Sequence, residues 1–267
     1  MELLRRKAPA RSLIELAKQT ALIGCAVLFY FVVRGRTEGG ESLAIENGLR
    51  LLEHEEDLGI AVERSMQSWT EAHGLTTLAN WVYIWFHWPV IVATLLWLHH
   101  IRIEAYLVLR NAMFISGAIG LVIFVSLPVA PPRLIDAGFI DTVTEQSTSY
   151  RVLQPPALVN KYAAMPSLHV GWNLLIGIAL LGSSRLWLIR CFAVAGPALM
   201  ALAVVVTANH YVLDGVVGSG VALIGLFAAR RMTKPLVALD SRFRGAASNA
   251  LGPARLTSSE FHKDRGG

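Results

Sequence analysis

The chain alternates between long apolar blocks and shorter polar stretches. A block of about 20 apolar residues is what an α-helix needs to cross a hydrocarbon core roughly 30 Å thick. Glu15 and Lys18 interrupt the first block, and the fourth is short for a span. The pattern predicts an all-α polytopic membrane protein, a bundle of six transmembrane helices. The predicted spans are about Leu13–Val33, Leu78–Leu98, Tyr106–Leu127, Leu168–Leu181, Leu186–Thr207 and Tyr211–Ala229.

The composition supports a membrane protein and argues against other classes. Hydrophobic residues make up 54% of the 267 residues and charged residues 16%, whereas soluble domains carry about 25% charged residues. Both cysteines, Cys25 and Cys191, lie inside apolar blocks, so neither a disulfide framework nor a C-x-x-C metal site is expected. The net charge of +5 comes without a nucleic-acid-binding motif, so no nucleic-acid partner is expected.

Basic residues orient the predicted bundle, because Lys and Arg close to a membrane prefer its cytoplasmic side. They gather before the first block and at alternate connections, around Arg5, Arg102, Arg185 and Arg230. Both termini are therefore expected in the cytoplasm, and the plasma membrane is the expected location. The first block is followed by Arg34–Arg36 rather than by a small-residue cleavage site, so we interpret it as a retained span.

The blocks divide the chain into three parts. Residues 1–12 form a basic cytoplasmic N-terminus, 13–230 the six-span domain and 231–267 a cytoplasmic tail. The tail is rich in Gly, Ser, Ala and Arg, a composition typical of disorder.

Two long connections, 37–77 and 128–167, fall on the predicted outer side. In the first, Glu41–Gln67 mixes leucines with many acidic residues, which predicts an amphipathic helix too polar to cross lipid. This extracytoplasmic helix either lies on the membrane surface or forms a small cap packed on the bundle. The pattern does not choose between the two.

Three short stretches place ionisable residues at the ends of apolar blocks. They are Ala130–Arg133, Met165–His169 and Asn209–Asp214, and all three lie at the predicted outer face. An ionisable residue within or at the mouth of a span costs several kcal/mol unless it is paired. These stretches are therefore the candidate functional site.

Within them, His210 and Asp214 lie one helical turn apart on the same face. A carboxylate that accepts from one imidazole nitrogen raises the basicity of the other, which is how a histidine nucleophile is built. His169, from another span, is suited to protonate a leaving alkoxide. Arg133 offers a permanently charged fork for phosphate oxygens, and Ser167 a hydroxyl at a helix start, where anions are favoured.

Each candidate also has a structural interpretation. A single membrane histidine often serves only to hold helices together, and Arg133 alone fits an interfacial anchor. Tyr83 and His87 form another pair four residues apart, for which helix packing is the favoured explanation over a role in a substrate pocket. Lys161 is a further pocket candidate that equally fits a solvated loop.

The motifs P-P-R, P-S-L-H and H-Y-x-x-D-x-x-x-G, ending at Gly218, resemble the type 2 phosphatidic acid phosphatase superfamily. The resemblance covers about Asn80 to Ala229 and is greatest to the inositol phosphotransferase-like branch, which contains inositol phosphorylceramide synthase. It implies that His210 is a nucleophile forming a phosphohistidine, that Asp214 orients it and that His169 acts as acid and then base. Arg133 and Ser167 would bind the substrate phosphate, with no metal and no cofactor.

The chain departs from the wider superfamily pattern at three positions. Ser126, Leu168 and Val204 stand where that pattern has lysine, glycine and arginine. Two phosphate-binding cations are therefore missing, and Lys161 or Arg151 are the candidates to replace the lost charge.

The sequence thus predicts a membrane-embedded phosphatase or phosphotransferase acting on a lipid phosphate, diphosphate or phosphodiester. Water as acceptor gives a phosphatase, and an inositol-type or other alcohol acceptor gives a phosphotransferase. An ion or proton-coupled transporter is the rival, although its ionisable groups would be spread along a path rather than clustered at one face. A catalytically inactive lipid-binding scaffold is a third hypothesis.

Overall fold

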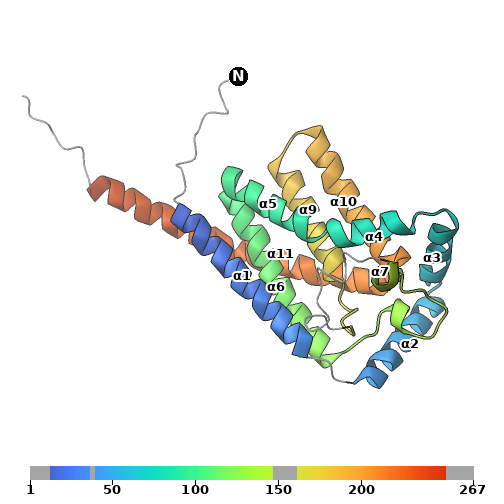
Figure 1. Ribbon diagram of the computed structural model, residues 1–267. Helices are drawn as coiled ribbons and strands as arrows, with labels where there is room; N and C mark the ends of the chain where they lie inside the picture. Colours follow the sequence, from blue (N-terminus) through green and yellow to red (C-terminus); the bar gives the residue numbers. More distant parts are fainter. Residues whose placement is uncertain (1–12, 37–39, 147–160, 251–267) are drawn as a thin grey trace, which may run out of the picture.

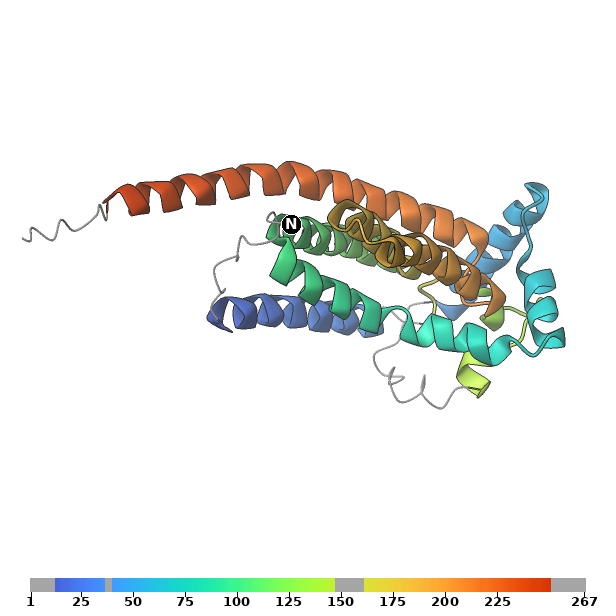
Figure 2. The ribbon, with the colours of Figure 1, turned by 90° about the horizontal axis from the view of Figure 1, so that it is seen from above.

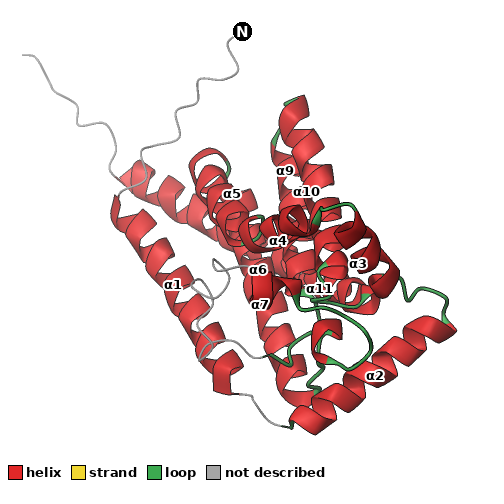
Figure 3. Cartoon of the chain, turned by 45° about the vertical axis from the view of Figure 1, so that its right-hand side comes forward, coloured by secondary structure: helices red, strands yellow, loops and turns green. Residues whose placement is uncertain are grey.

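In the computed structural model, the described residues are 13–36, 40–146 and 161–250. These ranges are helices joined by loops and contain no strand, only an isolated bridge between Val129 and Ala163 (Figures 1 and 3). The helices are α1 Leu13–Arg36, α2 Glu41–Asp57, α3 Glu63–Ala72, α4 Thr76–Trp85, α5 Trp88–Ile101, α6 Ile103–Ser126, a 3₁₀ turn Pro132–Leu134, α7 Thr142–Gln146, α9 Leu168–Ser183, α10 Trp187–Val206 and α11 Val212–Ala250.

The centre of the bundle is made by α6, α9, α10 and α11, and α9 packs on each of the other three. Two glycines allow α9 and α11 to touch backbone to backbone. A Cβ on Gly218 would lie 2.1 Å from the Ser167 carbonyl oxygen, and one on Gly171 would lie 2.4 Å from the Gly218 carbonyl oxygen. Only glycine permits such close approach of two helices. The final glycine of the third motif therefore has a packing role.

Three helices are long and apolar enough to cross a membrane, namely Ile103–Ser126, Trp187–Val206 and Val212–Thr233. The pair formed by α4 and α5 makes a fourth span if it is counted as one. The helix α9 is apolar but only 16 residues long. The structure thus confirms the all-α class and membrane-type apolar helices, while the count of six spans stays a prediction.

The segment predicted as a single span at Leu78–Leu98 is a broken one. The helices α4 and α5 meet at an angle of 40° around Phe86 and His87. Pro89 has no N–H to donate to the preceding turn, which favours a new helix start at this point. The break turns the His87 side chain into the bundle, where it is buried.

The segment predicted as one helix at Glu41–Gln67 is two, α2 and α3, separated by residues 58–62. Figure 2 shows both at one end of the bundle, beside the start of α11. Here α2 contacts α11, and α3 contacts α10 and α4. At the other end of the chain α11 continues to Ala250, so part of the predicted tail is helical, while 251–267 lie outside the described residues.

Candidate active site

A tight turn between α10 and α11 presents His210. The Val204 carbonyl accepts hydrogen bonds from the backbone N–H groups of both Asn209 and His210, each at 3.1 Å. Ala208 within this turn has a φ of +52°, an uncommon conformation for a residue with a side chain. The backbone of the turn therefore fixes where the His210 ring leaves the chain.

The His210 ring is held through its Nδ1 atom. This nitrogen lies 2.8 Å from the Ala164 carbonyl oxygen and 3.3 Å from Asp214 Oδ2. A carbonyl oxygen can only accept, so Nδ1 carries a proton, and in the neutral ring Nε2 then carries the lone pair. The sequence predicts Asp214 alone as the orienting partner, but the shorter bond is to a loop carbonyl.

Asp214 is completely buried. Its Oδ2 also accepts from the Tyr211 N–H at 2.9 Å, which caps the start of α11. Its Oδ1 has no hydrogen-bond partner within the described residues. The carboxylate is thus positioned by its own helix and faces His210 with one oxygen.

Ser167 stands at the N-cap of α9 and joins it to α11. Its N–H donates to the Asp214 carbonyl oxygen at 2.9 Å, so the second and third motifs are in direct contact. The Ser167 hydroxyl is buried and bonds to nothing in the described part of the chain. A buried hydroxyl at a helix N-terminus is suited to an anionic oxygen.

The His169 ring faces His210 from the first turn of α9, with ring centroids 5.7 Å apart. It also stacks on Tyr83 at 4.7 Å and lies 4.2 Å from the His87 ring. His87 Nδ1 in turn lies 3.3 Å from the amide nitrogen of Asn173. The structure therefore brings Tyr83 and His87 to the histidine cluster, although the sequence favoured a packing role for both.

Arg133 reaches the turn that carries His210. Its backbone N–H donates to the Ala208 carbonyl oxygen at 3.0 Å and its Nε to Asn209 Oδ1 at 2.9 Å. Its Nη1 forms an ion pair with Asp141 Oδ2 at 2.5 Å, and the Arg133 side chain is only 8% exposed. Asp141 therefore balances the Arg133 charge, and Nη2 is left without a partner among residues 13–36, 40–146 and 161–250.

The two candidates for a replacement cation do not join this cluster in the described structure. Lys161 is exposed on the loop before α9 and has no hydrogen bond or ion pair to a described residue. Arg151 lies outside the described residues. Ser126 bonds within its own helix, to the Val122 carbonyl, and Val204 is buried in an apolar cluster.

Two buried glutamates, which the sequence did not single out, hold the start of α11. Glu63 Oε1 accepts from the Val212 N–H at 2.8 Å, and Glu55 Oε1 accepts from the Leu213 N–H at 2.6 Å. Both side chains are fully buried, although they come from an acidic stretch that looks solvent-exposed in sequence. Two carboxylates at one helix N-terminus are favoured by the helix dipole but repel each other.

Burial and, to a smaller extent, the neighbouring Glu63 carboxyl raise the pKa of Glu55 from 4.5 to about 8. Glu55 therefore keeps its proton at neutral pH. Burial likewise raises the pKa of the neighbouring Tyr211, whose hydroxyl donates to the Ala130 carbonyl oxygen at 3.0 Å. The Tyr211 hydroxyl ties the first motif to the third.

A metal centre would need a group of at least three ligating side chains. In the described ranges no three or more His, Cys, Asp or Glu residues are grouped so that they could hold a metal ion. Metal independence stays a prediction.

A family model described as PAP2 superfamily matches residues 49–228 of the chain. The match covers all three motifs and about two thirds of the sequence. No curated protein and no solved structure gave a significant match.

Proposed function

The chain belongs to the PAP2 superfamily, and on that premise we propose that it is a membrane-embedded lipid phosphatase or phosphotransferase that works through a phosphohistidine on His210. Superfamily membership supports a phosphoric ester hydrolase or phosphotransferase in general terms. The apolar helices around the site residues support a lipid substrate.

One observation carries the proposal. His210 Nδ1 is tied to the Ala164 carbonyl and to Asp214, so Nε2 keeps its lone pair and forms no bond within the described structure. Attack through Nε2 makes the ring cationic, and the adjacent buried Asp214 stabilises that cation. A second histidine lies 5.7 Å away, close enough to act on a group bound between them.

The first step forms a bond from His210 Nε2 to phosphorus and breaks the bond from phosphorus to the lipid oxygen. His169 gives a proton to the departing oxygen, which leaves as an alcohol or as the shorter phosphate. In the second step water or an alcohol gives its proton to His169 and attacks phosphorus. The bond from phosphorus to nitrogen breaks, and His210 returns to its neutral state.

The phosphate itself would be held by neutral donors more than by cations. The neutral donors are the buried Ser167 hydroxyl and the first-turn N–H groups of α9, and the cationic donor is the remaining Arg133 nitrogen. Since Asp141 balances Arg133, the described site has little net positive charge. This favours a phosphodiester, with one negative charge, over a phosphomonoester, which carries about −1.5 to −2 near neutral pH.

A phosphodiester donor with an alcohol acceptor is the inositol-type transferase alternative. The test is to incubate purified protein with phosphomonoester, diphosphate and phosphodiester lipids, with and without inositol and lipid alcohols. Free phosphate, released phosphomonoester and newly formed phosphodiester are measured separately. New phosphodiester identifies a transferase, free phosphate or a phosphomonoester released from a phosphodiester identifies hydrolysis by water, and the absence of all three products for every pair would refute the proposed function. Activity should survive EDTA.

We also propose that the site faces the non-cytoplasmic side, because basic residues flank the opposite ends of the helices. Asp136→Cys, exposed near the site, should react with an impermeant thiol reagent in intact cells, in a chain whose two natural cysteines are replaced by serine. Ser184→Cys, in the loop between α9 and α10, is the matched control and should react only after lysis. The reverse pattern would overturn this orientation.

A further inference from the structure

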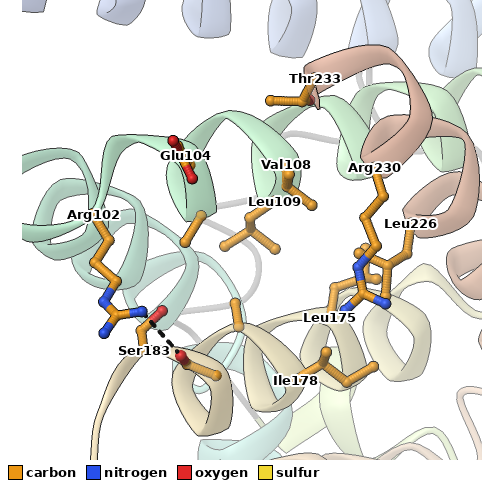
Figure 4. A pocket seen from close by; sticks show the side chains of 13 residues that line it. Arg102, Glu104, Val108, Leu109, Leu175, Ile178, Ser183, Leu226, Arg230 and Thr233 are labelled. Carbon is orange, nitrogen blue, oxygen red and sulfur yellow. Dashed lines mark hydrogen bonds between the residues drawn. The ribbon is translucent and has the colours of Figure 1, made fainter. Parts of the chain in front are cut away.

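A cavity of about 590 Å³ lies at the end of the bundle opposite His210, between α6, α9 and α11 (Figure 4). Arg102, at the junction of α5 and α6, and Arg230, on α11, stand on its two sides. Its wall is apolar and includes Val108, Leu175 and Ile178. The cavity is thus lined by two cationic side chains and an apolar wall.

The cavity is separate from the candidate active site. Arg230 lies 16 residues along α11 from Asp214, which at 1.5 Å per residue is roughly 24 Å. Gly182 and Ser183, at the end of α9, line the cavity, whereas His169 is in the first turn of that helix. A ligand bound here would not touch His210.

Neither of the two arginines forms an ion pair with a described residue. Arg230 forms no hydrogen bond or ion pair with the described residues, and Arg102 forms a single long bond, from Nη1 to the Gly182 carbonyl oxygen at 3.4 Å. Glu104 is the one acidic residue among those that line the cavity. Two arginines and one glutamate leave a formal charge of +1, which favours an anion.

The position of the cavity favours one class of anion, the head group of a lipid. Its helices include two of the three that are long and apolar enough to span a membrane, and Arg102 and Arg230 lie at the same ends of these two apolar segments, Ile103–Ser126 and Val212–Thr233. Basic pockets between helices at a membrane face bind the head groups of anionic lipids, and apolar walls bind acyl chains. A free anion would use the arginines and leave the apolar wall uncovered.

We propose that this cavity binds an anionic phospholipid, with its phosphate between Arg102 and Arg230 and an acyl chain against Val108 and Ile178. The bound lipid would connect α6, α9 and α11, the helices that hold the site residues in place. The proposal depends on the bundle lying in a membrane and not on the reaction at His210.

The test uses full-length protein freed of lipid in a neutral detergent, titrated with phosphatidylglycerol or phosphatidylcholine and followed by native mass spectrometry and by melting temperature. Phosphatidylglycerol should bind more tightly and raise the melting temperature more. Arg102→Gln and Arg230→Gln should each weaken phosphatidylglycerol binding about fivefold, which corresponds to about 1 kcal/mol per basic residue.

Arg231→Gln is the matched control. Arg231 is the next residue on α11, but its guanidinium lies over the Phe227 ring at 4.2 Å and does not line the cavity. This variant should bind phosphatidylglycerol as the natural chain does. Equal loss in all three variants would mean that the effect is general surface charge, and it would overturn the proposal.

A third ligand, glycerol phosphate, tests whether the cavity recognises a whole lipid or only a phosphate group. It carries the charged group without acyl chains, so it should neither raise the melting temperature nor displace phosphatidylglycerol at equal concentration. A full shift with glycerol phosphate, or equal binding of the two phospholipids, would contradict lipid binding.

Discussion

The two ends of the helix bundle differ in how their charged side chains are bonded. At the end that holds His210, charged side chains form short bonds to the protein, as Arg133 does to Asp141 and Glu63 does to the Val212 N–H. At the other end, Arg102 and Arg230 face a cavity. Arg102 forms one long hydrogen bond to the described chain, and Arg230 forms none. The first end is organised before any ligand arrives, as catalysis requires, and the second leaves its charges to a ligand.

Substitutions of His210 and Asp214 should have the largest effects on activity. His210→Gln should abolish turnover of every substrate, because no covalent intermediate can form. Asp214→Asn should lower kcat by about 10⁴, as loss of an orienting carboxylate does in other triads. Arg230→Gln, at the other end, should leave kcat within a factor of two of the natural value. Steady-state kinetics on one lipid substrate measures all three, and equal losses at both ends would break the comparison.

The contact that positions α9 on α11 should be nearly as sensitive. Gly218→Ala would force a Cβ to within 2.1 Å of the Ser167 carbonyl oxygen, and neither backbone can give way without moving a motif. We expect a destabilisation of at least about 3 kcal/mol and loss of activity. Gly220→Ala is the control, because no atom lies within 4 Å of the position of its Cβ. Thermal unfolding in detergent gives the difference, and similar melting temperatures for the two variants would contradict the packing role of Gly218.

The division of labour between the histidines predicts a selective defect. His169→Ala should lower the rate by about 10² to 10⁴ for a lipid with an alkoxide leaving group. The defect should shrink for a nitrophenyl ester, whose leaving group needs no proton. Rates measured with the two substrates give the ratio of the defects. A ratio near one would show that His169 does not act as the acid.

The Glu55 and Glu63 pair predicts a smaller, pH-dependent effect. With its pKa raised from 4.5 to about 8, Glu55 keeps in the folded protein a proton that it loses when the chain unfolds. The contribution of Glu55 to stability is therefore greatest near pH 4.5 and falls as the pH rises toward 8. Glu55→Gln should flatten the dependence of melting temperature on pH.

The matched control for this prediction is Glu56→Gln, on the exposed neighbour. It should melt with the same pH dependence as the natural chain. If Glu55→Gln keeps the full pH dependence, or if stability rises toward pH 8, the proton is wrongly assigned to Glu55.

The same contrast explains what the sequence could and could not predict. The apolar blocks predicted an all-α membrane-type fold. The spacing of His210 and Asp214 predicted their contact, although His210 lies in the turn before α11 and not on the helix as the spacing suggested. The bend at His87 follows from local signals only in part, since Pro89 favours a helix start but does not fix the 40° angle.

The sequence did not predict which residues far apart in the chain contact the site. The Ala164 carbonyl is a backbone group without any sequence signature, and only the folded loop brings it to His210. Glu55 and Glu63 belong to an acidic stretch whose pattern resembles a solvated helix face, yet they meet the first N–H groups of α11, about 150 residues later. Asp141 likewise gives no hint in sequence that it balances Arg133.

A phosphohistidine on His210 can be tested directly by trapping the phosphoryl group on the protein. Purified protein is mixed with lipid labelled in its phosphate, quenched within one turnover, and the label on the protein is located by mass spectrometry. We predict acid-labile, alkali-stable label on His210 in the natural chain, retained in His169→Ala with a nitrophenyl substrate and absent from His210→Gln. Label on His210→Gln, or label with the alkali lability of an acyl phosphate, would contradict the account.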